Sequence, residues 1–428
     1  MKRILALALA AVMALGMVGC GPKDNGSASA SGSGSAAPST GEEIVYWSMW
    51  TENEPQGMVI KEAAAAYEAK TGIHVNIEWK GRDITNVLKA ALDAGENVDV
   101  FDDDFQRVSM QFAENAADLE EMAKAAGYED FAVPALPTAV RGWAGKLVCI
   151  PYQPYTSGVF YTQSSFDAAG IKEEPKTWDE FLDVCQKLKD AGYTPLAQDD
   201  AYTRYTFGFV LARMIGEDAV KELTTNGGWA ASAEAKQAAQ FIVDLRDKGF
   251  LSDTAPDAYP NGENELGLGT ASMVVNASWV PGEITNNVKE GGTELNETWG
   301  MFNFPSMTAN DKDAATIANI GAQAMAVNAK SEKAQAAFDF IMTVTSGEFD
   351  QKMALEANGI PADTRNEEWP EMIANIRDDF NAQTDVYEWN MGLNANADVK
   401  EGLTECVTKL FEGSLDAQGF VEAMDALY

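Results

Sequence analysis

Short apolar runs alternate with longer stretches of helical spacing along the first part of the chain after residue 43. The run Ile44–Trp47 has the length of a buried strand, and apolar residues then recur every three to four positions between Pro55 and Gly72. Strands that alternate with helices of about 10–15 residues pair in parallel. The pattern therefore predicts an α/β fold, with strands at residues 44–47, 73–79 and 98–101 and helices at 55–72 and 84–92.

Signals of both kinds continue in the rest of the chain. Residues 145–151 are predicted to form a strand that runs into a proline- and tyrosine-rich segment. Thr177 and Glu180 have the spacing of a capping box, which begins a helix. A region rich in helical spacing follows, and α/β material returns with a strand at 325–327 and a helix at 331–342.

The length of this region predicts more than one hydrophobic core. About 385 residues follow residue 43, whereas a single core stops growing at roughly 250–300 residues. We therefore expect two lobes.

The N-terminus has the pattern of an export signal. Lys2 and Arg3 precede an apolar run that is too short for a comfortable membrane span, and the run ends in Met17-Val18-Gly19-Cys20. This tetrad resembles the lipobox of bacterial lipoproteins, which implies removal of residues 1–19 and lipidation of Cys20. The alternative is an ordinary secretory signal that ends near a cysteine.

The segment after Cys20 has the composition of a flexible tether. Residues 20–43 consist largely of Gly, Ser, Ala, Pro and Thr, which cannot bury apolar surface. We expect a lipid-anchored protein whose folded part faces the extracellular side of the cell membrane and meets the membrane only through its anchor.

The charge of the chain excludes several partners. The formal net charge is −35, and loss of Lys2 and Arg3 with the signal would leave 29 basic against 66 acidic residues, a charge of −37. A surface this acidic repels nucleic acid and anionic lipid. Neither is expected as a partner.

Cysteine and histidine are too few for common metal or nucleophile chemistry. Besides Cys20 there are Cys149, Cys185 and Cys406, which indicate no disulfide framework and leave open whether any of them pair. His74 is the single histidine, so a histidine-based zinc site or a catalytic triad is not expected. Glycine-rich phosphate-binding motifs are also missing from the sequence, and we predict no cofactor.

Aromatic residues occur beside carboxylates and amides where predicted strands end. Ligands of open α/β sheets bind at such ends, and flat rings suit the C–H faces of a sugar while carboxylates and amides pair with its hydroxyls. Trp50 and Trp279 lie in polar, loop-like contexts that favour ligand contact, whereas Trp47 and Trp299 are expected in the core. The acids Asp102–Asp104 could instead cap a helix or bind calcium weakly.

Several motifs in family order carry a resemblance to a known family. The motifs are Gly145–Pro151 with Tyr161 and Phe166–Ile171, then Pro175–Phe181, Gly192–Leu196 and Asn276–Trp279. Through them the chain resembles the extracellular solute-binding proteins of bacterial ABC importers, in the branch that binds sugars and oligosaccharides.

The resemblance implies a two-lobed periplasmic-binding-protein-like fold with discontinuous lobes. The first lobe would hold residues 44–151 and 308–348, and the second 152–307 and 349–428. Hinge segments would lie near residues 151–153, 304–306 and 346–349. Ligand would bind between the lobes and close them. The ligand-binding residues implied are Trp50, Glu52, Asp103 or Asp104, Tyr155, Tyr202, Trp279 and Trp389.

The sequence and the resemblance together predict a monomeric, non-enzymatic receptor. It would capture a carbohydrate, of which an oligosaccharide is favoured, and deliver it to ABC permease subunits with their ATPase. The same fold binding a polyamine or another small solute is the first alternative. An extracellular glycoside hydrolase is the second, because paired acids could serve that chemistry.

Overall fold

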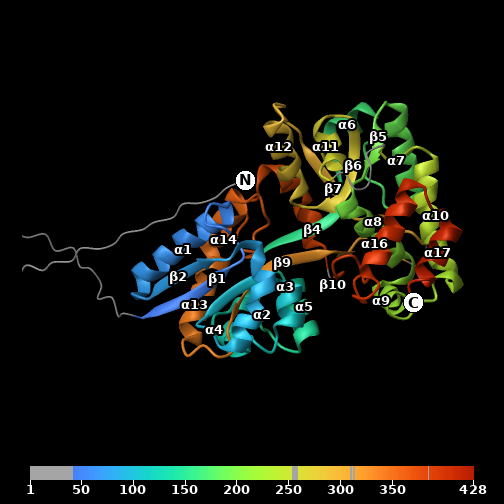
Figure 1. Ribbon diagram of the computed structural model, residues 1–428. Coiled ribbons are helices and arrows are strands. Elements are labelled where there is room, and N and C mark those ends of the chain that lie inside the picture. Colours follow the sequence, from blue (N-terminus) through green and yellow to red (C-terminus); the bar gives the residue numbers. More distant parts are fainter. Residues whose placement is uncertain (1–41, 253–258, 309–310, 312–313, 384) are drawn as a thin grey trace, which may run out of the picture. The chain divides into compact units, whose positions relative to one another are not determined.

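The computed structural model describes residues 42–252, 259–308, 311, 314–383 and 385–428, which belong to one compact unit (Figure 1). The predicted signal segment 1–19, the predicted lipidation site Cys20 and nearly all of the linker 20–43 lie outside the described residues. Within them, no helix is long and apolar enough to cross a membrane.

A mixed sheet forms the centre of the described fold. Its strand order is β2-β1-β3-β9-β4-β6-β5, with β7 on β4, and a separate short sheet pairs β8 with β10. The strands are β1 (Glu43–Ser48), β2 (His74–Trp79), β3 (Val100–Asp104), β4 (Ile150–Thr162), β5 (Thr194–Ala197), β6 (Ala271–Ala277), β7 (Trp299–Phe302), β8 (Ile317–Ala318), β9 (Ile320–Val327) and β10 (Asp385–Val386).

The N-terminal strands pair as their alternation with helices predicts. Strand β1 is parallel to both β2 and β3, because each crossover passes through a helix. Strand β9 then closes this part of the sheet by pairing antiparallel to β3. The predicted α/β fold is confirmed here.

Strand β4 passes through the whole middle of the sheet. Its first part, from Ile150 to Thr156, pairs antiparallel with β9. Its second part, from Ser157 onward, pairs antiparallel with β6 and β7. The register shifts between Tyr152 and Tyr155, so a bulge lies where the strand leaves one partner for the others.

The α-helices pack partly on the strands of the sheet and partly on one another (Figure 1). They are α1 (Pro55–Thr71), α2 (Ile84–Ala94), α3 (Phe105–Gln111), α4 (Glu120–Ala125), α5 (Ala135–Ala144), α6 (Gln163–Ala168), α7 (Trp178–Asp190), α8 (Asp200–Ile215), α9 (Glu217–Asn226), α10 (Ala233–Asp247), α11 (Asn261–Gly267), α12 (Val280–Glu290), α13 (Ala334–Thr345), α14 (Gly347–Glu356), α15 (Arg377–Asn381), α16 (Lys400–Glu412) and α17 (Ala417–Asp425). Short 3₁₀ helices span Gly81–Asp83, Tyr128–Asp130, Trp229–Ala231 and Glu371–Ile376.

Local sequence signals set several helix ends. Helix α1 begins at Pro55 and ends before Gly72, which adopts φ 76° at the C-cap, as the sequence predicts. The capping box at the start of α7 is also confirmed: the Thr177 hydroxyl accepts from the Glu180 amide at 3.3 Å, and the Glu180 carboxylate accepts from the Thr177 amide at 3.0 Å.

Apolar side chains gather in two buried clusters. One contains Ile44, Phe101 and Phe340 from the β1, β3 and α13 region. The other contains residues of α7, α8 and α17, among them Phe181 and Phe420. Two cores agree with the size argument, while the lobe boundaries at 151/152, 307/308 and 348/349 stay a prediction.

Two predicted strand positions need correction. The strand expected at 145–151 begins only at Ile150 and continues to Thr162, because Gly145 serves as the C-cap of α5 with φ 74°. The third strand is displaced towards the C-terminus, so Asp102–Asp104 form the end of β3 rather than the loop after it. Alternation within a strand then decides which of these acids face the core.

The cysteines and several tryptophans lie in the interior. Cys149, Cys185 and Cys406 are free and buried. Trp47 and Trp299, expected in the core, expose 6 % and 2 %. Among the described residues, no cluster of three or more Cys, His, Asp or Glu side chains is arranged to hold a metal ion.

Candidate functional site: a cleft with aromatic and amide walls

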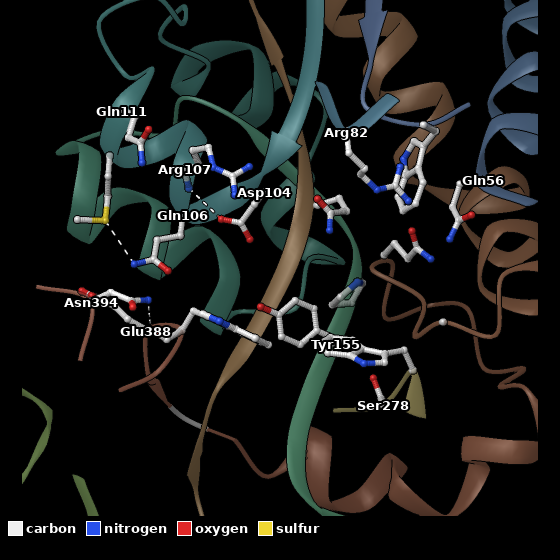
Figure 2. A pocket seen from close by; sticks show the side chains of 18 of the residues that line it. Gln56, Arg82, Asp104, Gln106, Arg107, Gln111, Tyr155, Ser278, Glu388 and Asn394 are labelled. Carbon is white, nitrogen blue, oxygen red and sulfur yellow. Dashed lines mark hydrogen bonds between the residues drawn. The ribbon is translucent and has the colours of Figure 1, made fainter. Parts of the chain in front are cut away.

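A cavity of about 1080 Å³ opens beside the middle of the sheet. Its lining comes from segments far apart in the chain: the turn after β1, the 3₁₀ helix before α2, the start of α3, strands β4 and β9, the turn after β6, and loops near residues 358 and 394. Figure 2 shows Asp104 and Arg107 on one side of this space and Tyr155 and Ser278 on another. The cavity is therefore assembled around the strand that links both parts of the sheet.

Three aromatic rings form one wall of the cavity. The Tyr155 ring meets Trp279 edge-on at a centroid distance of 4.9 Å, and Trp389 lies 6.1 Å from Trp279 with an angle of 31° between the rings. The indole N–H of Trp279 donates to the Tyr202 hydroxyl at 3.3 Å, and Tyr205 supports Trp389 from 4.7 Å. Partners behind the wall fix the ring orientations before any ligand arrives.

Asp104 brings a carboxylate to the opposite side. It caps α3 by accepting from the Arg107 amide at 2.9 Å. Burial raises the pKa of Asp104 to about 6. In Figure 2 the Tyr155 hydroxyl points towards the same space as this carboxyl group. A ligand in the cavity therefore meets a hydrogen-bond acceptor whose charge changes near neutral pH.

Trp50 is less accessible than its loop-like sequence predicts. Its side chain exposes only 6 %, because its N–H donates to the Tyr152 hydroxyl at 2.6 Å and that hydroxyl donates to Asp102 at 2.7 Å. The Arg82 guanidinium lies 4.5 Å from the indole centre. Trp50 therefore borders the cavity with its ring held in one orientation and the Arg82 guanidinium beside it.

Amide side chains supply most of the remaining polar lining. They come from both ends of the cavity and from its floor, and they offer donors and acceptors without net charge. They are Gln56, Gln106, Gln111, Gln153, Gln323, Asn358 and Asn394.

The cavity has a balanced charge, although the chain as a whole is strongly acidic. Arg82, Arg107 and Lys400 line it together with Asp104 and Glu388. The Asp103 carboxylate pairs with Arg107, and Glu54 accepts from Arg82 at 2.6 Å. A strongly cationic ligand would therefore find no excess of negative charge here.

Five of the predicted ligand-binding residues line this cavity and three do not. Glu52 pairs with Lys61 on the surface. Asp103 is fully buried, since alternation in β3 turns it away from the cavity, and Tyr202 stands behind Trp279. Those in the lining are Trp50, Asp104, Tyr155, Trp279 and Trp389.

The sequence analysis missed the basic and amide residues of the lining. Gln153 had a signal, because it follows the predicted strand at 145–151. Gln323 had no such signal. It lies before the strand predicted at 325–327, and a residue inside the longer strand β9 would ordinarily be expected in the hydrophobic core. Arg82 and Arg107 lie in segments whose polarity equally suits an exposed surface.

Comparison with known proteins identifies the family. The family model of bacterial extracellular solute-binding proteins matches residues 51–348, so the chain belongs to this family of binding proteins. The relatives and structures described next are binding or transport proteins too.

Two curated relatives and one solved structure show the range of similarity. The melibiose/raffinose/stachyose-binding protein MelE of Bacillus subtilis (strain 168) is 26% identical over 147 residues, which span 34% of this chain and a third (33%) of that protein. The diacetylchitobiose binding protein DasA of Streptomyces coelicolor (strain ATCC BAA-471 / A3(2) / M145) is 25% identical over 84% of this chain and 81% of its own. A sugar transporter structure from Bacillus licheniformis in complex with stachyose superposes with a TM-score of 0.64 at 18% identity, covering 90% and 99% of the two chains. The two-lobed α/β fold of solute-binding proteins is thereby confirmed.

Proposed function

We propose that this protein is the lipid-anchored, extracellular substrate-binding component of an ABC importer, which captures an oligosaccharide between its two lobes and delivers it to a membrane permease. Family membership supports the binding and transport role. The observation that carries the carbohydrate assignment is the aromatic wall of Tyr155, Trp279 and Trp389 facing amides and the Asp104 carboxyl group across one cavity.

The chemistry of the two walls matches the two kinds of surface on a sugar. Aromatic faces bury the apolar C–H face of a pyranose ring, which removes apolar surface of both partners from water. Amides and a carboxylate pair with hydroxyl groups at the ring edge. MelE and DasA, named for binding oligosaccharides, support the same class of ligand.

The size of the cavity favours an oligosaccharide over a single sugar. Pockets for drug-sized ligands measure roughly 300–1,000 Å³, and this one is about 1080 Å³. A monosaccharide would leave most of the aromatic and amide lining without a partner.

The charges of the lining argue against the polyamine alternative. Arg82 and Arg107 are already paired with Glu54 and Asp103, and Glu388 is paired with Lys221, so the described lining holds no surplus of carboxylates for a polycation to pair with. A binding protein should return an added oligosaccharide uncleaved, whereas the hydrolase alternative predicts its cleavage.

Ligand binding tests the proposal directly. Thermal unfolding of the full chain in detergent would be followed with melibiose, raffinose, stachyose, diacetylchitobiose and spermidine. A sugar present at 100 times its Kd stabilises the protein by about 2.7 kcal/mol, and chromatography of the incubated sugar reports any cleavage. Stabilisation by spermidine alone, or cleavage of the sugar, would replace the proposal by the corresponding alternative.

Anchoring needs a separate test. Cys20→Ser removes the proposed lipidation site, so we expect the protein to move from the membrane fraction into the medium. Mass spectrometry of the wild-type N-terminal peptide should show acyl chains on Cys20. Retention of the variant in the membrane would contradict the anchor and leave the binding role intact.

A further inference from the structure

Three hydrogen-bonding side chains lie in a row on the floor of the cavity, on three neighbouring strands. Asp104 at the end of β3 is directly opposite Gln323 of β9, and Gln323 in turn is opposite Tyr152 of β4, next to Gln153. All three members of the row, Asp104, Gln323 and Gln153, line the cavity. Neighbouring strands lie about 4.8 Å apart, so the side chains can reach adjacent groups of one ligand.

The two glutamines of this row have unused hydrogen-bonding capacity. Their amide oxygens are shut off from solvent and accept no hydrogen bond within the described residues. A buried acceptor without a partner destabilises the folded state. Both side chains line the cavity from neighbouring strands, and their terminal torsions are soft, so donors of a ligand would satisfy these oxygens once the amides turn towards it.

The backbone conformation of Gln153 also supports a ligand-binding role for its side chain. It adopts φ 47°, a left-handed conformation that a glycine would take more readily than a glutamine. It does so inside the bulge between Tyr152 and Tyr155. Strained residues of this kind persist at ligand-binding positions, where the side chain is needed.

We infer that Gln153 and Gln323 are specificity-determining residues, whose amide oxygens accept hydrogen bonds from hydroxyl groups of one sugar ring while Asp104 accepts from the neighbouring hydroxyl. The inference rests on the proposed function and extends it to residues that neither the family match nor the relatives assign. An uncharged acceptor pairs with a hydroxyl without needing a counter-charge, so the two glutamines favour a neutral, polyhydroxylated ring.

Aromatic packing next to the row gives the ring its orientation. The Tyr155 side chain lies against Gly321, two residues before Gln323 on β9. A sugar whose C–H face rests on the aromatic wall would therefore present its edge hydroxyls towards the glutamines. Sites built to hydrogen-bond a hydroxyl discriminate strongly against ligands that lack it, because the buried polar groups then stay unpaired.

Opposite effects on stability and affinity distinguish this role from a structural one. Gln323→Met and Gln153→Met keep the length of an unbranched side chain and remove the unpartnered oxygen. We expect the Tm of the sugar-free variants to be equal to or above that of the wild type. Their affinity for sugar should fall about tenfold or more, as expected for loss of a ligand hydrogen bond that nothing replaces.

Gln198→Met is the matched control. Gln198 is another buried glutamine with an unpartnered amide oxygen, but it does not line the cavity. Its replacement should leave sugar affinity unchanged. The full chain in detergent would be titrated with melibiose, raffinose, stachyose and diacetylchitobiose, and the tightest of these used for all variants.

The outcomes separate the inference from the function on which it rests. A wild-type protein that binds none of the four sugars overturns the carbohydrate assignment and the inference together. A wild type that binds, with Gln323→Met and Gln153→Met binding equally well, overturns the inference alone. Weaker binding accompanied by a lower Tm also overturns it, since the glutamines would then support the fold. Weaker binding at an unchanged or raised Tm establishes it.

Discussion

At the scale of single residues, the space beside Gly321 decides where Tyr155 can lie. A Cβ atom at position 321 would stand 2.1 Å from the Tyr155 hydroxyl oxygen and 2.2 Å from its Cζ. The ring of Tyr155 therefore occupies the volume that any other residue at 321 would need. The aromatic wall depends on this glycine although glycine contributes no ligand contact of its own.

Gly321→Ala should displace Tyr155 and weaken sugar binding. We expect about a tenfold loss of affinity, with a stability cost of roughly 1–3 kcal/mol for the overpacked site. Titration calorimetry and urea unfolding measure the two effects. Gly142→Ala is the control, since nothing lies within 4 Å of its added Cβ; equal affinities in both variants would show that Tyr155 does not contact the ligand.

Trp279 tests the aromatic wall directly. Trp279→Ala should weaken sugar affinity by roughly 1–3 kcal/mol, because stacking and burial of one aromatic ring are of that size. Titration calorimetry gives the affinity, and circular dichroism checks that the fold persists. Trp369→Ala, whose ring packs on Phe380 5.8 Å away, should bind as the wild type does. Unchanged affinity in Trp279→Ala would remove this residue from the site.

Asp104 predicts how binding depends on pH. Its pKa of about 6 means that the carboxyl group is mostly ionised at pH 7.5 and mostly protonated at pH 5. A ligand hydroxyl donates to the ionised form, so affinity should fall as the pH drops through about 6. Calorimetric titrations between about pH 5 and pH 8 measure this slope. Asp104→Asn should bind more weakly and without the slope; a slope that survives the substitution would assign it to another group.

At the scale of elements, the loop that carries Trp389 is held by a small ionic network. Lys221 of α9 donates to Glu388 at 2.6 Å and pairs with Glu217 at 3.3 Å, and the Glu388 amide donates to Glu217 at 2.7 Å. Directly after Trp389, residues 390–392 all have positive φ. A loop with three consecutive left-handed residues needs such external contacts to keep one conformation.

Lys221→Met should loosen this loop. The two glutamates would lose their shared cation while remaining largely buried, so we expect a stability loss of roughly 1–3 kcal/mol and a several-fold weaker sugar affinity. Urea unfolding and calorimetry report the two quantities. Lys409→Met, which breaks an exposed pair with Glu405, should change stability by less than about 1 kcal/mol. Similar losses in both variants would show that the network around Trp389 has no special role.

The sequence predicted elements well where one local signal acted alone. The first strands and helices, and the capped start of α7, follow from periodicity and from Thr177 and Glu180. The strand predicted at 145–151 covered only the start of β4, and its continuation to Thr162 was hidden by Pro151 and Pro154, which argue against a central strand. The structure accommodates them because the bulge between Tyr152 and Tyr155 relieves the ladder at Pro154, a compensation that only the paired partner reveals.

The site was predictable in its aromatic part and not in its amide part. Trp279 stands out as a rare residue type in a polar context, and Trp389 was reached through the family resemblance. Gln323 is one polar residue within a buried strand, and its position next to Asp104 follows from strand register, which no local pattern of the sequence contains. Long-range pairing is the physical reason for what sequence reasoning missed.

At the scale of the whole molecule, a buried carboxyl group links the free energy of unfolding to pH. Burial, reinforced by Glu283 and Asp199, raises the pKa of Glu263 from 4.5 to about 9. The folded protein thus holds a proton that the unfolded chain releases above pH 4.5. The stabilisation is complete below that pH and is lost progressively as the pH rises towards 9.

Glu263→Gln should remove this part of the pH dependence. A group that is protonated when folded and ionised when unfolded lowers the free energy of unfolding by about 1.4 kcal/mol per pH unit. Urea unfolding of wild type and variant at pH 6 and pH 8 measures the difference, with Glu405→Gln, on the exposed surface of α16, as the control. Parallel curves for Glu263→Gln and wild type would place the titrating proton elsewhere.

The bulge in β4 has a mechanical consequence. Gln153 and Tyr155 lie where one strand passes from β9 to β6 and β7, so under the closure of two lobes that we propose they would lie close to the hinge. Side chains close to a hinge move little when the lobes rotate. On the proposed function, a sugar bound to Gln153 would therefore keep its contacts at the bulge while the two lobes close on the rest of it.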